Sequence, residues 1–539
     1  MQSGILKRLA ATVAFVALVA PVTATAQSVT PFTQAIAVAA AEDDALSAFY
    51  RESKFAPLWV GDDAVHRARR AAFLAVVDKA GLHGLPANRY DADRIRQMMR
   101  AADTPREMGK LDVELSRLFL RFASDMSTGI LEPGRVVSDI KRTVPESQRL
   151  DLLRDISGDR PYAVMDRLGP QSQEYNRLIR ARLTLEDAIV NGTWGEPVRA
   201  SRLERGAQGD EVVRLRDRLI AMGYLDRSAS QVFDASMQKA VEAFQTDHGL
   251  AVDGVVGGKT LEELNVSPED RLGSVLVAME RERWMNFDRG DRHIWVNLTD
   301  FHAQIVVDGE VYFETKSVIG KNVSSQETPE FSDEMDHMVI NPYWYVPRSI
   351  IVNEYLPGLR RNPGAHGHLD IIASNGRVVS RNRSFSQYSA RSFPFSMRQK
   401  PGPRNALGRV KFMFPNKYNI YLHDTPAQSL FSQTVRAFSH GCIRLDDPYE
   451  FGHALLELQN DPSPEATFNR YLNSGQNSRV NLADPLPVHI VYRTAIAKPG
   501  GGMEYRDDIY GRDARILSAL QAEGVTMPRA QARLALSDG

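Results

Sequence analysis

The chain has 539 residues, with 66 lysines and arginines against 67 aspartates and glutamates, and 43% of its residues are hydrophobic. A chain of this length is too long for a single hydrophobic core, so we expect about two to four domains. Because the opposite charges nearly cancel, the composition excludes the strong net positive charge that would indicate nucleic acid as a partner.

The first residues have the three parts of a secretory signal peptide. A basic pair at residues 7–8 precedes an apolar stretch over residues 9–22 and a small-residue cleavage site, Ala24-Thr25-Ala26. The apolar stretch is shorter than the roughly 20 residues that a membrane-spanning helix needs. We therefore expect removal of residues 1–26, a mature chain that begins near Gln27, and a periplasmic location. An uncleaved segment that anchors the chain in the inner membrane is the alternative.

Residues 27–200 are predicted to be helical. After a low-complexity linker, apolar residues recur three and four positions apart over residues 44–59, 71–79 and 111–126. This spacing is that of an amphipathic helix. No group of catalytic residues accompanies it, so we expect a structural role for this region. A further helical pattern within residues 267–285 is expected to complete it.

Residues 201–266 have the pattern of three small helices. The first has apolar residues at helical spacing from Val212 to Met222, the second from Phe233 to Phe244, and the third contains Leu261 and Leu264. Turns that contain glycine separate them. We expect a small helical domain of its own.

The part of the chain from about residue 286 to residue 494 alternates apolar and polar residues, as β-strands do. The expected strands lie at residues 294–298, 305–307, 311–313, 337–340 and 488–492. Asp308-Gly309 between two of them is a strong β-hairpin signal. The sequence therefore predicts a multidomain α+β protein with a mostly-β domain over residues 286–494. Residues 495–539 are expected to be a C-terminal tail.

A segment from about residue 349 to residue 404 interrupts the strands of this domain. It is too long for a simple connection. It begins after the aromatic residues 343–345 and ends just before the strand that leads to His423, so we expect it to form a lid over the site described next. His366, His368 and Asp370 within it lack the further ligands of a zinc site. We therefore expect no metal and no cofactor.

Cys442 is the only cysteine of the chain, and it ends the run Ser439-His440-Gly441-Cys442. A second histidine, His423, stands nineteen positions before it, where a strand is expected to end. A thiol attacks as the thiolate, and a nearby imidazole that takes its proton is the usual way to generate one. A single thiol in an exported protein cannot form an intramolecular disulfide. The sequence therefore indicates a nucleophilic cysteine paired with His423.

These residues resemble the motif of the L,D-transpeptidase family with the YkuD-type catalytic domain. The motif is a histidine, a spacer, Ser-His-Gly-Cys and an Arg or Asn two positions later, and here the spacer between His423 and Ser439 has fifteen residues and Arg444 fills the last position. Residues 56–59, 83–85 and 129–133 resemble the helical scaffold domain of the large Gram-negative members. Residues 243–245 and 252–254 resemble a peptidoglycan-binding domain.

The resemblance implies domains and a reaction. Residues 27–200 with 267–285 would be the scaffold, 201–266 the peptidoglycan-binding domain and 286–494 the catalytic domain. Cys442 would cleave the bond between diaminopimelate and D-alanine in a tetrapeptide stem, form a thioester, and pass the acyl group to a neighbouring stem as a 3-3 cross-link. It would also be acylated by carbapenems. Stem peptides and glycan strands would be the partners, and other enzymes of cell-wall synthesis are further candidates.

The expected roles of the site residues follow from this chemistry. His423 would transfer protons, oriented by Asp424 through its backbone carbonyl or, as second choice, its carboxylate. Backbone N–H groups of His440, Gly441 and Cys442 would stabilise the oxyanion. Substrate-binding roles are expected for Tyr421, Ser439, Arg444 and Trp344, with a salt bridge inside the fold as the alternative for Arg444.

Three other functions remain open at this point. The same site would also serve an L,D-carboxypeptidase or endopeptidase, or an enzyme that attaches a lipoprotein or exchanges D-amino acids. A non-catalytic peptidoglycan-binding module with an idle thiol is the third. The sequence does not indicate the oligomeric state.

Overall fold

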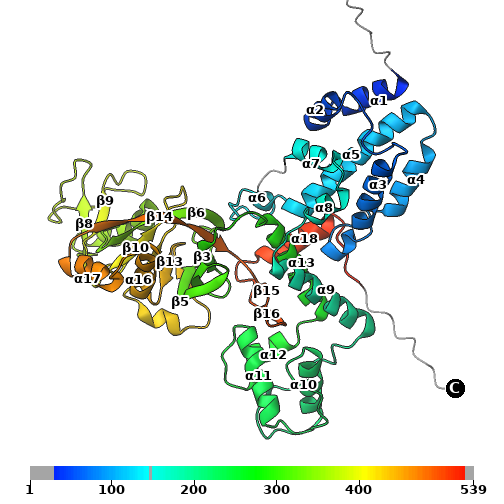
Figure 1. Ribbon diagram of the computed structural model, residues 1–539. Helices are drawn as coiled ribbons and strands as arrows, with labels where there is room; N and C mark the ends of the chain where they lie inside the picture. The colour runs from blue at the N-terminus through cyan, green and yellow to red at the C-terminus, as the bar shows by residue number, and fades with distance from the viewer. Residues whose placement is uncertain (1–29, 145–147, 529–539) are drawn as a thin grey trace, which may run out of the picture.

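The computed structural model describes residues 30–144 and 148–528. Figure 1 shows three lobes: a β-rich lobe at the left, a helical lobe at the upper right and a small helical lobe at the bottom, which meet around α13 (Pro268–Trp284) and α18 (Arg512–Ala522). The expected signal peptide, residues 1–26, lies outside the described residues. Among the residues that the structure describes, no helix has both the length and the hydropathy needed to cross a membrane.

The helical lobe is a bundle built around its longest helix, α5. Its elements are α1 (Pro31–Ala40), α2 (Asp44–Glu52), α3 (Ala64–Val77), η1 (Ala80–His83), α4 (Ala92–Ala101), α5 (Pro105–Thr128), α6 (Pro133–Val136), α7 (Arg149–Ser157), α8 (Pro161–Asp166) and α9 (Gln173–Asn191). α5 begins at a capping box formed by Thr104 and Glu107. Leu115 and Phe119, four positions apart, are fully buried against the surrounding helices.

Asp112 on α5 is a buried carboxylate that fixes the chain between α2 and α3. It accepts hydrogen bonds from the backbone N–H of Leu58 at 2.9 Å, Trp59 at 2.7 Å and Val60 at 3.0 Å, and from the Tyr50 hydroxyl at 2.6 Å. One side chain therefore satisfies donors from two other segments of the bundle.

Replacing Asp112 by alanine should lower the free energy of unfolding by about 3 kcal/mol or more, because each buried donor left without an acceptor costs about 1–3 kcal/mol. Urea denaturation measures the change. The matched control is Asp93→Ala, which removes a carboxylate that is 82% exposed and should change stability by less than about 0.5 kcal/mol. Equal losses in the two variants would contradict this role for Asp112.

The small lobe contains α10 (Asp210–Ala221), α11 (Ala235–Asp247) and α12 (Gly258–Leu264), with a two-stranded pair β1 (Arg202–Leu203) and β2 (Val256–Gly257). The three helices confirm the predicted pattern. Gln245 on α11 explains the local sequence: its side-chain nitrogen donates to the Asp253 carboxylate at 2.8 Å, and its oxygen accepts from the Gly254 backbone at 2.9 Å. One buried amide thus holds the turn that leads to α12.

The β-rich lobe is a mixed sheet of nine strands in the order β12-β5-β13-β11-β10-β6-β14-β3-β4, and β4 also pairs with β5, so the sheet curls back on itself. The strands are β3 (Arg292–Asn297), β4 (His302–Val307), β5 (Glu310–Gly320), β6 (Phe331–Ile340), β10 (Val410–Met413), β11 (Leu422–His423), β12 (Ala437–Ser439), β13 (Ile443–Leu445) and β14 (Ser478–Val491). The predicted hairpin is confirmed: Val307 pairs with Glu310, and Asp308 and Gly309 both have positive φ. The helices of this lobe are η3 (Gln428–Ser432), α16 (Pro448–Leu458) and α17 (Pro464–Ser474).

The insertion forms a module with its own core. It contains η2 (Ile351–Tyr355), α15 (Leu356–Arg361), β8 (Leu369–Ile372) and β9 (Ser396–Gln399), and α14 (Arg348–Ile350) leads into it. The strand β7 (Trp344–Tyr345), just before the insertion, completes a three-stranded sheet in the order β7-β9-β8. Leu359, Ile371 and Phe385 are among its buried residues. Figure 1 shows β8 and β9 at the outer end of the β-rich lobe. An independent core lets this module act as a unit.

Residues 495–528 do not form the tail that we expected. They form the hairpin β15 (Ala495–Ala497) and β16 (Met503–Tyr505) and the helix α18, whose Ile516 and Leu520 are buried in one core with α9 and α13. The helical spacing of these two residues was present in the sequence, but a segment this short has no amphipathic signal strong enough to predict packing.

A buried ion network joins this C-terminal segment to the rest of the chain. Arg281 on α13 donates to Asp513 at 3.0 and 2.8 Å and to Glu330 at 2.6 Å. Arg512 donates to Glu330 at 3.0 Å and to the Thr328 carbonyl at 2.8 Å. Because Glu330 directly precedes β6 of the β-rich lobe, these ion pairs connect the C-terminal segment and α13 to that lobe. A buried charge that loses its partner is strongly destabilising, so the network holds only when each charge is paired.

Candidate active site

Three neighbouring strands bring the reactive side chains to one face of the sheet. His423 on β11 stands opposite Lys411 on β10 and opposite Arg444 on β13. Residues opposite each other on adjacent strands point to the same face. The alternate residues Phe412, Leu422 and Ile443 are fully buried on the other face, in the core. The alternation of the strands therefore places His423 between two cationic groups, with Cys442 two residues before Arg444.

Cys442 lies in a tight turn between β12 and β13, and its side chain is half-buried. Gly441 has φ of +113°, a conformation that residues with a Cβ rarely adopt. The Ser439 hydroxyl donates to the Cys442 carbonyl at 2.5 Å and accepts from the Gly441 N–H at 3.1 Å. The Thr328 hydroxyl donates to the Gly441 carbonyl at 2.8 Å. The Ser-Gly-Cys part of the motif is thus what shapes the turn that presents the thiol.

This turn corrects two expected roles. Ser439 borders the cleft, but it is only 2% exposed and both bonds of its hydroxyl stay within the turn, so it does not offer that hydroxyl to a substrate. The Gly441 N–H, expected to be an oxyanion donor, is already bonded to Ser439. Within the described residues, no protein acceptor is recorded for the N–H groups of His440 and Cys442, which leaves these two as donors.

His423 is held by the backbone of its neighbour. Its Nδ1 lies 2.5 Å from the Asp424 carbonyl oxygen, so Nδ1 donates and Nε2 is left as the proton acceptor. The Asp424 carboxylate has other partners: it accepts from the N–H of Arg409 at 2.7 Å and of Thr425 at 2.6 Å. Of the two predicted ways in which Asp424 orients the imidazole, the structure therefore shows the backbone carbonyl.

The surroundings of the site favour the neutral forms of the thiol and of the imidazole. Burial raises the pKa of Cys442 to about 11, although hydrogen bonds from Tyr421 and the nearby Arg444 and Lys411 charges act in the opposite direction. Burial and the Arg444 charge lower the pKa of His423 to about 3. A preformed thiolate–imidazolium pair is disfavoured by both shifts. The arrangement instead suits general-base catalysis, in which the proton leaves the thiol as sulfur attacks.

We expect the alkylation of Cys442 by iodoacetamide to accelerate about tenfold per pH unit from about pH 7 to about pH 9, with no plateau below about pH 10. The reason is that the thiolate is the minor form at every pH below the raised pKa of about 11. Intact mass spectrometry measures the rate, and Cys442→Ser is the blank because the chain has no other cysteine. A plateau near pH 6 or 7 would show a preformed ion pair instead.

The thiol and the imidazole open into a cleft of about 710 Å³ between the sheet and the insertion. Trp344 and Tyr421, both expected to bind substrate, line it from the two sides, although Trp344 is 8% exposed and packs mainly into the core of the insertion. The Tyr421 ring lies 5.7 Å from the His423 ring. Of the segment expected to be a lid, residues 349–404, Ser349 and Ile350 line the cleft that contains Cys442.

Lys411 and Arg444 are two of the three cationic side chains that line the cleft, and neither forms a salt bridge with a carboxylate within the described residues. Burial lowers the pKa of both side chains, and the only acidic group that acts to raise it is the Cys442 thiol. Arg444 Nε is buried without a hydrogen-bond partner among the described residues. The alternative of a salt bridge for Arg444 is therefore not found in the described part of the chain. The sequence did not predict Lys411 as a site residue, because a lysine within a strand belongs to no recognisable motif. Only the pairing of Lys411 with His423 across β10 and β11 identifies it.

Glu354 of the insertion is a second residue that sequence reasoning missed. Its carboxylate lies 2.6 Å from Nε2 of His440, the histidine next to the thiol turn. We expected only the backbone of His440 to act, and the structure adds a contact between its side chain and η2. No sequence signal pairs these two residues, which are separated by 86 positions.

Three stretches of the chain match known families. Residues 291–456 match the "L,D-transpeptidase catalytic domain" of YkuD type. This stretch of the chain is therefore similar to an L,D-transpeptidase catalytic domain. Residues 44–181 match the "Scaffold domain" and residues 208–264 the "Putative peptidoglycan binding domain". The three-part resemblance seen in the motifs is confirmed.

A Haemophilus influenzae protein named "Putative L,D-transpeptidase" is 30% identical to the chain over 242 residues, which are 44% of this chain and 48% of that protein. The chain thus matches about half the length of this curated relative. Two solved structures also align: an L,D-transpeptidase from Xylanimonas cellulosilytica (16% identity, TM-score 0.16) and a fused Zn-dependent amidase/peptidase/peptidoglycan-binding protein from Clostridium acetobutylicum (13%, TM-score 0.15). They cover 55% and 54% of this chain and all of their own, and TM-scores this low add nothing to the family matches.

The residues around the thiol form no metal site. Within residues 30–144 and 148–528, no group of three or more His, Cys, Asp or Glu side chains is placed to hold a metal ion. His366 is half-buried and lies against the Tyr355 ring, with centroids 4.7 Å apart.

Proposed function

We propose that the protein is a periplasmic L,D-transpeptidase that forms 3-3 cross-links between peptidoglycan stems through a Cys442 thioester. The observation that carries the proposal is one cleft that holds the half-exposed thiol of Cys442 and the imidazole of His423, with Nδ1 already bonded to the Asp424 carbonyl. A thiol and an imidazole with Nε2 as acceptor in one cleft are the two groups that general-base catalysis needs, and in the free site the thiol donates to the Asn419 carbonyl at 3.4 Å. The peptidoglycan-binding domain supports peptidoglycan as the partner.

The first half of the reaction cleaves the donor stem. His423 Nε2 accepts the thiol proton while Cys442 Sγ attacks the carbonyl carbon that joins the L-centre of diaminopimelate to D-alanine. The oxygen becomes an oxyanion and accepts hydrogen bonds from the N–H groups of Cys442 and His440. As the carbon–nitrogen bond breaks, the imidazolium gives its proton to the D-alanine nitrogen. A thioester, a neutral imidazole and free D-alanine remain.

The second half transfers the acyl group. The side-chain amine of diaminopimelate on a neighbouring stem attacks the thioester carbonyl, and His423 takes a proton from the attacking nitrogen. The carbon–sulfur bond breaks, the new amide bond is the cross-link, and the sulfur recovers the proton. If water attacks the thioester instead of the amine, the same steps give hydrolysis. The product therefore depends on whether the amine or water reaches the thioester first.

The unpaired cations give the donor a binding mode. Stem peptides have carboxylates at their ends and on diaminopimelate, and Lys411 and Arg444 are cationic groups in the cleft without carboxylates of their own. A carboxylate of a bound stem would pair with these two cations, which have no carboxylate partner in the free site within the described residues. This supports a peptide substrate with carboxylates near the bond that is cleaved.

Incubation with the disaccharide-tetrapeptide, followed by mass analysis of the products, tests the function. The proposal expects a cross-linked dimer with loss of one D-alanine, and no dimer with Cys442→Ala. A disaccharide-tripeptide without dimer would assign the site to a carboxypeptidase. No turnover with retained binding to sacculi would leave a binding module. A carbapenem adduct at Cys442, one per chain, reports the nucleophile independently of any acceptor.

A further inference from the structure

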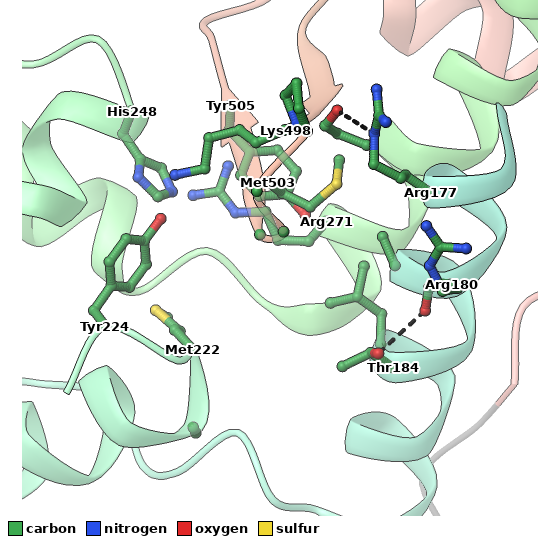
Figure 2. A pocket seen from close by; sticks show the side chains of 18 of the residues that line it. Arg177, Arg180, Thr184, Met222, Tyr224, His248, Arg271, Lys498, Met503 and Tyr505 are labelled. Atoms are coloured by element: carbon green, nitrogen blue, oxygen red, sulfur yellow. Dashed lines mark hydrogen bonds between the residues drawn. The ribbon is translucent and has the colours of Figure 1, made fainter. Parts of the chain in front are cut away.

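A second cavity lies far from the thiol, where three parts of the chain meet. It has a volume of about 390 Å³ and lies between α9 of the scaffold, the peptidoglycan-binding domain and the hairpin β15–β16. Figure 2 shows Tyr224, His248 and Met222 on one side, Arg177, Arg180 and Thr184 on the opposite side along α9, and Lys498, Met503 and Tyr505 between them. Cavities at domain junctions are common ligand sites, and this volume is that of a small ligand.

The cavity has an excess of positive charge. Arg177, Arg180, Arg271 and Lys498 line it, and no aspartate or glutamate does. Two of these cations are neutralised from outside the cavity, since Lys498 pairs with Asp247 at 2.6 Å and Arg271 with Glu263 at 2.7 Å. The Arg177 guanidinium donates only to the Ala497 carbonyl and the Gln173 side chain, and Arg180 has no recorded salt bridge within the described residues. Two arginines one helical turn apart are thus available to an anion.

The remaining walls suit a ring with polar edges. Trp194, Tyr224 and Tyr505 provide aromatic surface. His248 donates from Nδ1 to the Phe244 carbonyl at 2.7 Å, which leaves its Nε2 as an acceptor without a recorded protein partner in the described chain. Burial keeps this imidazole neutral, because it lowers the pKa of His248 to about 3. Aromatic faces, an acceptor nitrogen and free guanidinium groups together match an amino sugar that also has a carboxylate.

We propose that this cavity binds a carboxylated amino-sugar unit of a glycan strand at a position that carries no stem peptide, where the carboxylate is free, with the carboxylate at Arg177 and Arg180 and the sugar ring against the aromatic wall. The inference rests on the proposed function only in taking peptidoglycan as the partner. Its new content is that the site is composite: α9 and the β15–β16 hairpin, which lie outside the matched peptidoglycan-binding domain of residues 208–264, supply most of the walls.

A composite site has a mechanical consequence. A sugar bound there contacts the scaffold, the binding domain and the hairpin at once, and the hairpin continues β14 of the catalytic sheet through residues 492–494. Binding therefore fixes the orientation of the peptidoglycan-binding domain relative to the scaffold, which sets where the glycan strand runs relative to the rest of the protein.

Calorimetric titration of the full-length protein with N-acetylglucosaminyl-N-acetylmuramic acid, a disaccharide without a stem peptide, tests the proposal. Arg180→Glu should raise the Kd about tenfold or more, because it replaces a guanidinium–carboxylate contact by repulsion. The matched control is Arg205→Glu, which makes the same charge change at an exposed residue just before the matched binding domain and should change the Kd less than about twofold. N,N′-diacetylchitobiose, which lacks the carboxylate, should bind the wild type about tenfold more weakly and be insensitive to Arg180→Glu.

Absence of disaccharide binding to the wild type, or equal loss in both arginine variants, would overturn the composite site. Thermal unfolding of each variant separates these outcomes from misfolding, since Arg180 is exposed and its replacement should leave the midpoint unchanged. Acylation of Cys442 by a carbapenem is measured on the same samples. Acylation with no disaccharide binding rejects this site alone, whereas disaccharide binding without acylation rejects the proposed catalysis alone.

Discussion

His423→Ala should lower the rate of transpeptidation by about 10²–10⁴-fold, the range typical for loss of a general acid–base group. The loss should be large because the burial of Cys442 raises its thiol pKa to about 11, so almost no thiolate forms without a base. Binding to sacculi should remain nearly unchanged, since His423 is 4% exposed and lies in the catalytic cleft rather than on a glycan-binding surface. Rates come from chromatography of cross-linked dimers, and binding from co-sedimentation with sacculi.

His440→Ala is the matched control for His423→Ala. Both changes remove an imidazole that lines the cleft of Cys442, but Nε2 of His440 is bonded to the Glu354 carboxylate, whereas the Nδ1 bond of His423 leaves its Nε2 as the proton acceptor. Its expected oxyanion role uses the backbone, which alanine keeps. The loss should therefore be much smaller than for His423→Ala. Equal losses in the two variants would remove the Cys442–His423 pair from the mechanism.

The sequence was sufficient for those parts of the fold that local patterns determine. The Asp308-Gly309 hairpin and the three helices of residues 201–266 follow from period and turn chemistry, and the structure has them where they were predicted. The hairpin and helix of residues 495–528 were missed because their stability comes from packing against α13 and from the Arg281 and Arg512 ion pairs, which join segments about 180 or more positions apart. Contacts of that separation leave no local signal.

The same distinction applies within the site. The motif located Cys442 and His423, because its residue types and spacing are fixed by the chemistry of a nucleophile and a base. It did not reveal that the Ser439 hydroxyl and the Gly441 N–H bond to each other, since a turn of four residues allows several hydrogen-bond patterns. It also missed Lys411, whose place beside His423 depends on the register of β10 against β11. The roles assigned to Cys442 and His423 stay predictions until the variants are measured.

Replacing residues 349–404 by a short Gly/Ser linker should lower the cross-linking of tetrapeptide by about 10²-fold or more. The insertion supplies Ser349 and Ile350 to the cleft of Cys442, and it reaches the thiol turn through Glu354 and His440. A cover of this kind holds the donor in place and keeps water from the thioester, which is how substrate-covering segments raise the yield of transfer over hydrolysis. The alternative is an insertion that only packs against the domain.

Two measurements distinguish a lid from passive packing. Cys442 of the shortened enzyme should react with iodoacetamide at least as fast as in the intact chain, because the thiol turn is held by Ser439 and Thr328, which the replacement leaves in place. Glu354→Ala keeps the insertion but removes its contact with His440, so it should lower cross-linking several-fold and raise the share of hydrolysed tripeptide. Since the insertion has a core of its own around Leu359 and Phe385, this single change should not unfold it. Normal cross-linking by a shortened enzyme that is still folded would show that the insertion is not a lid.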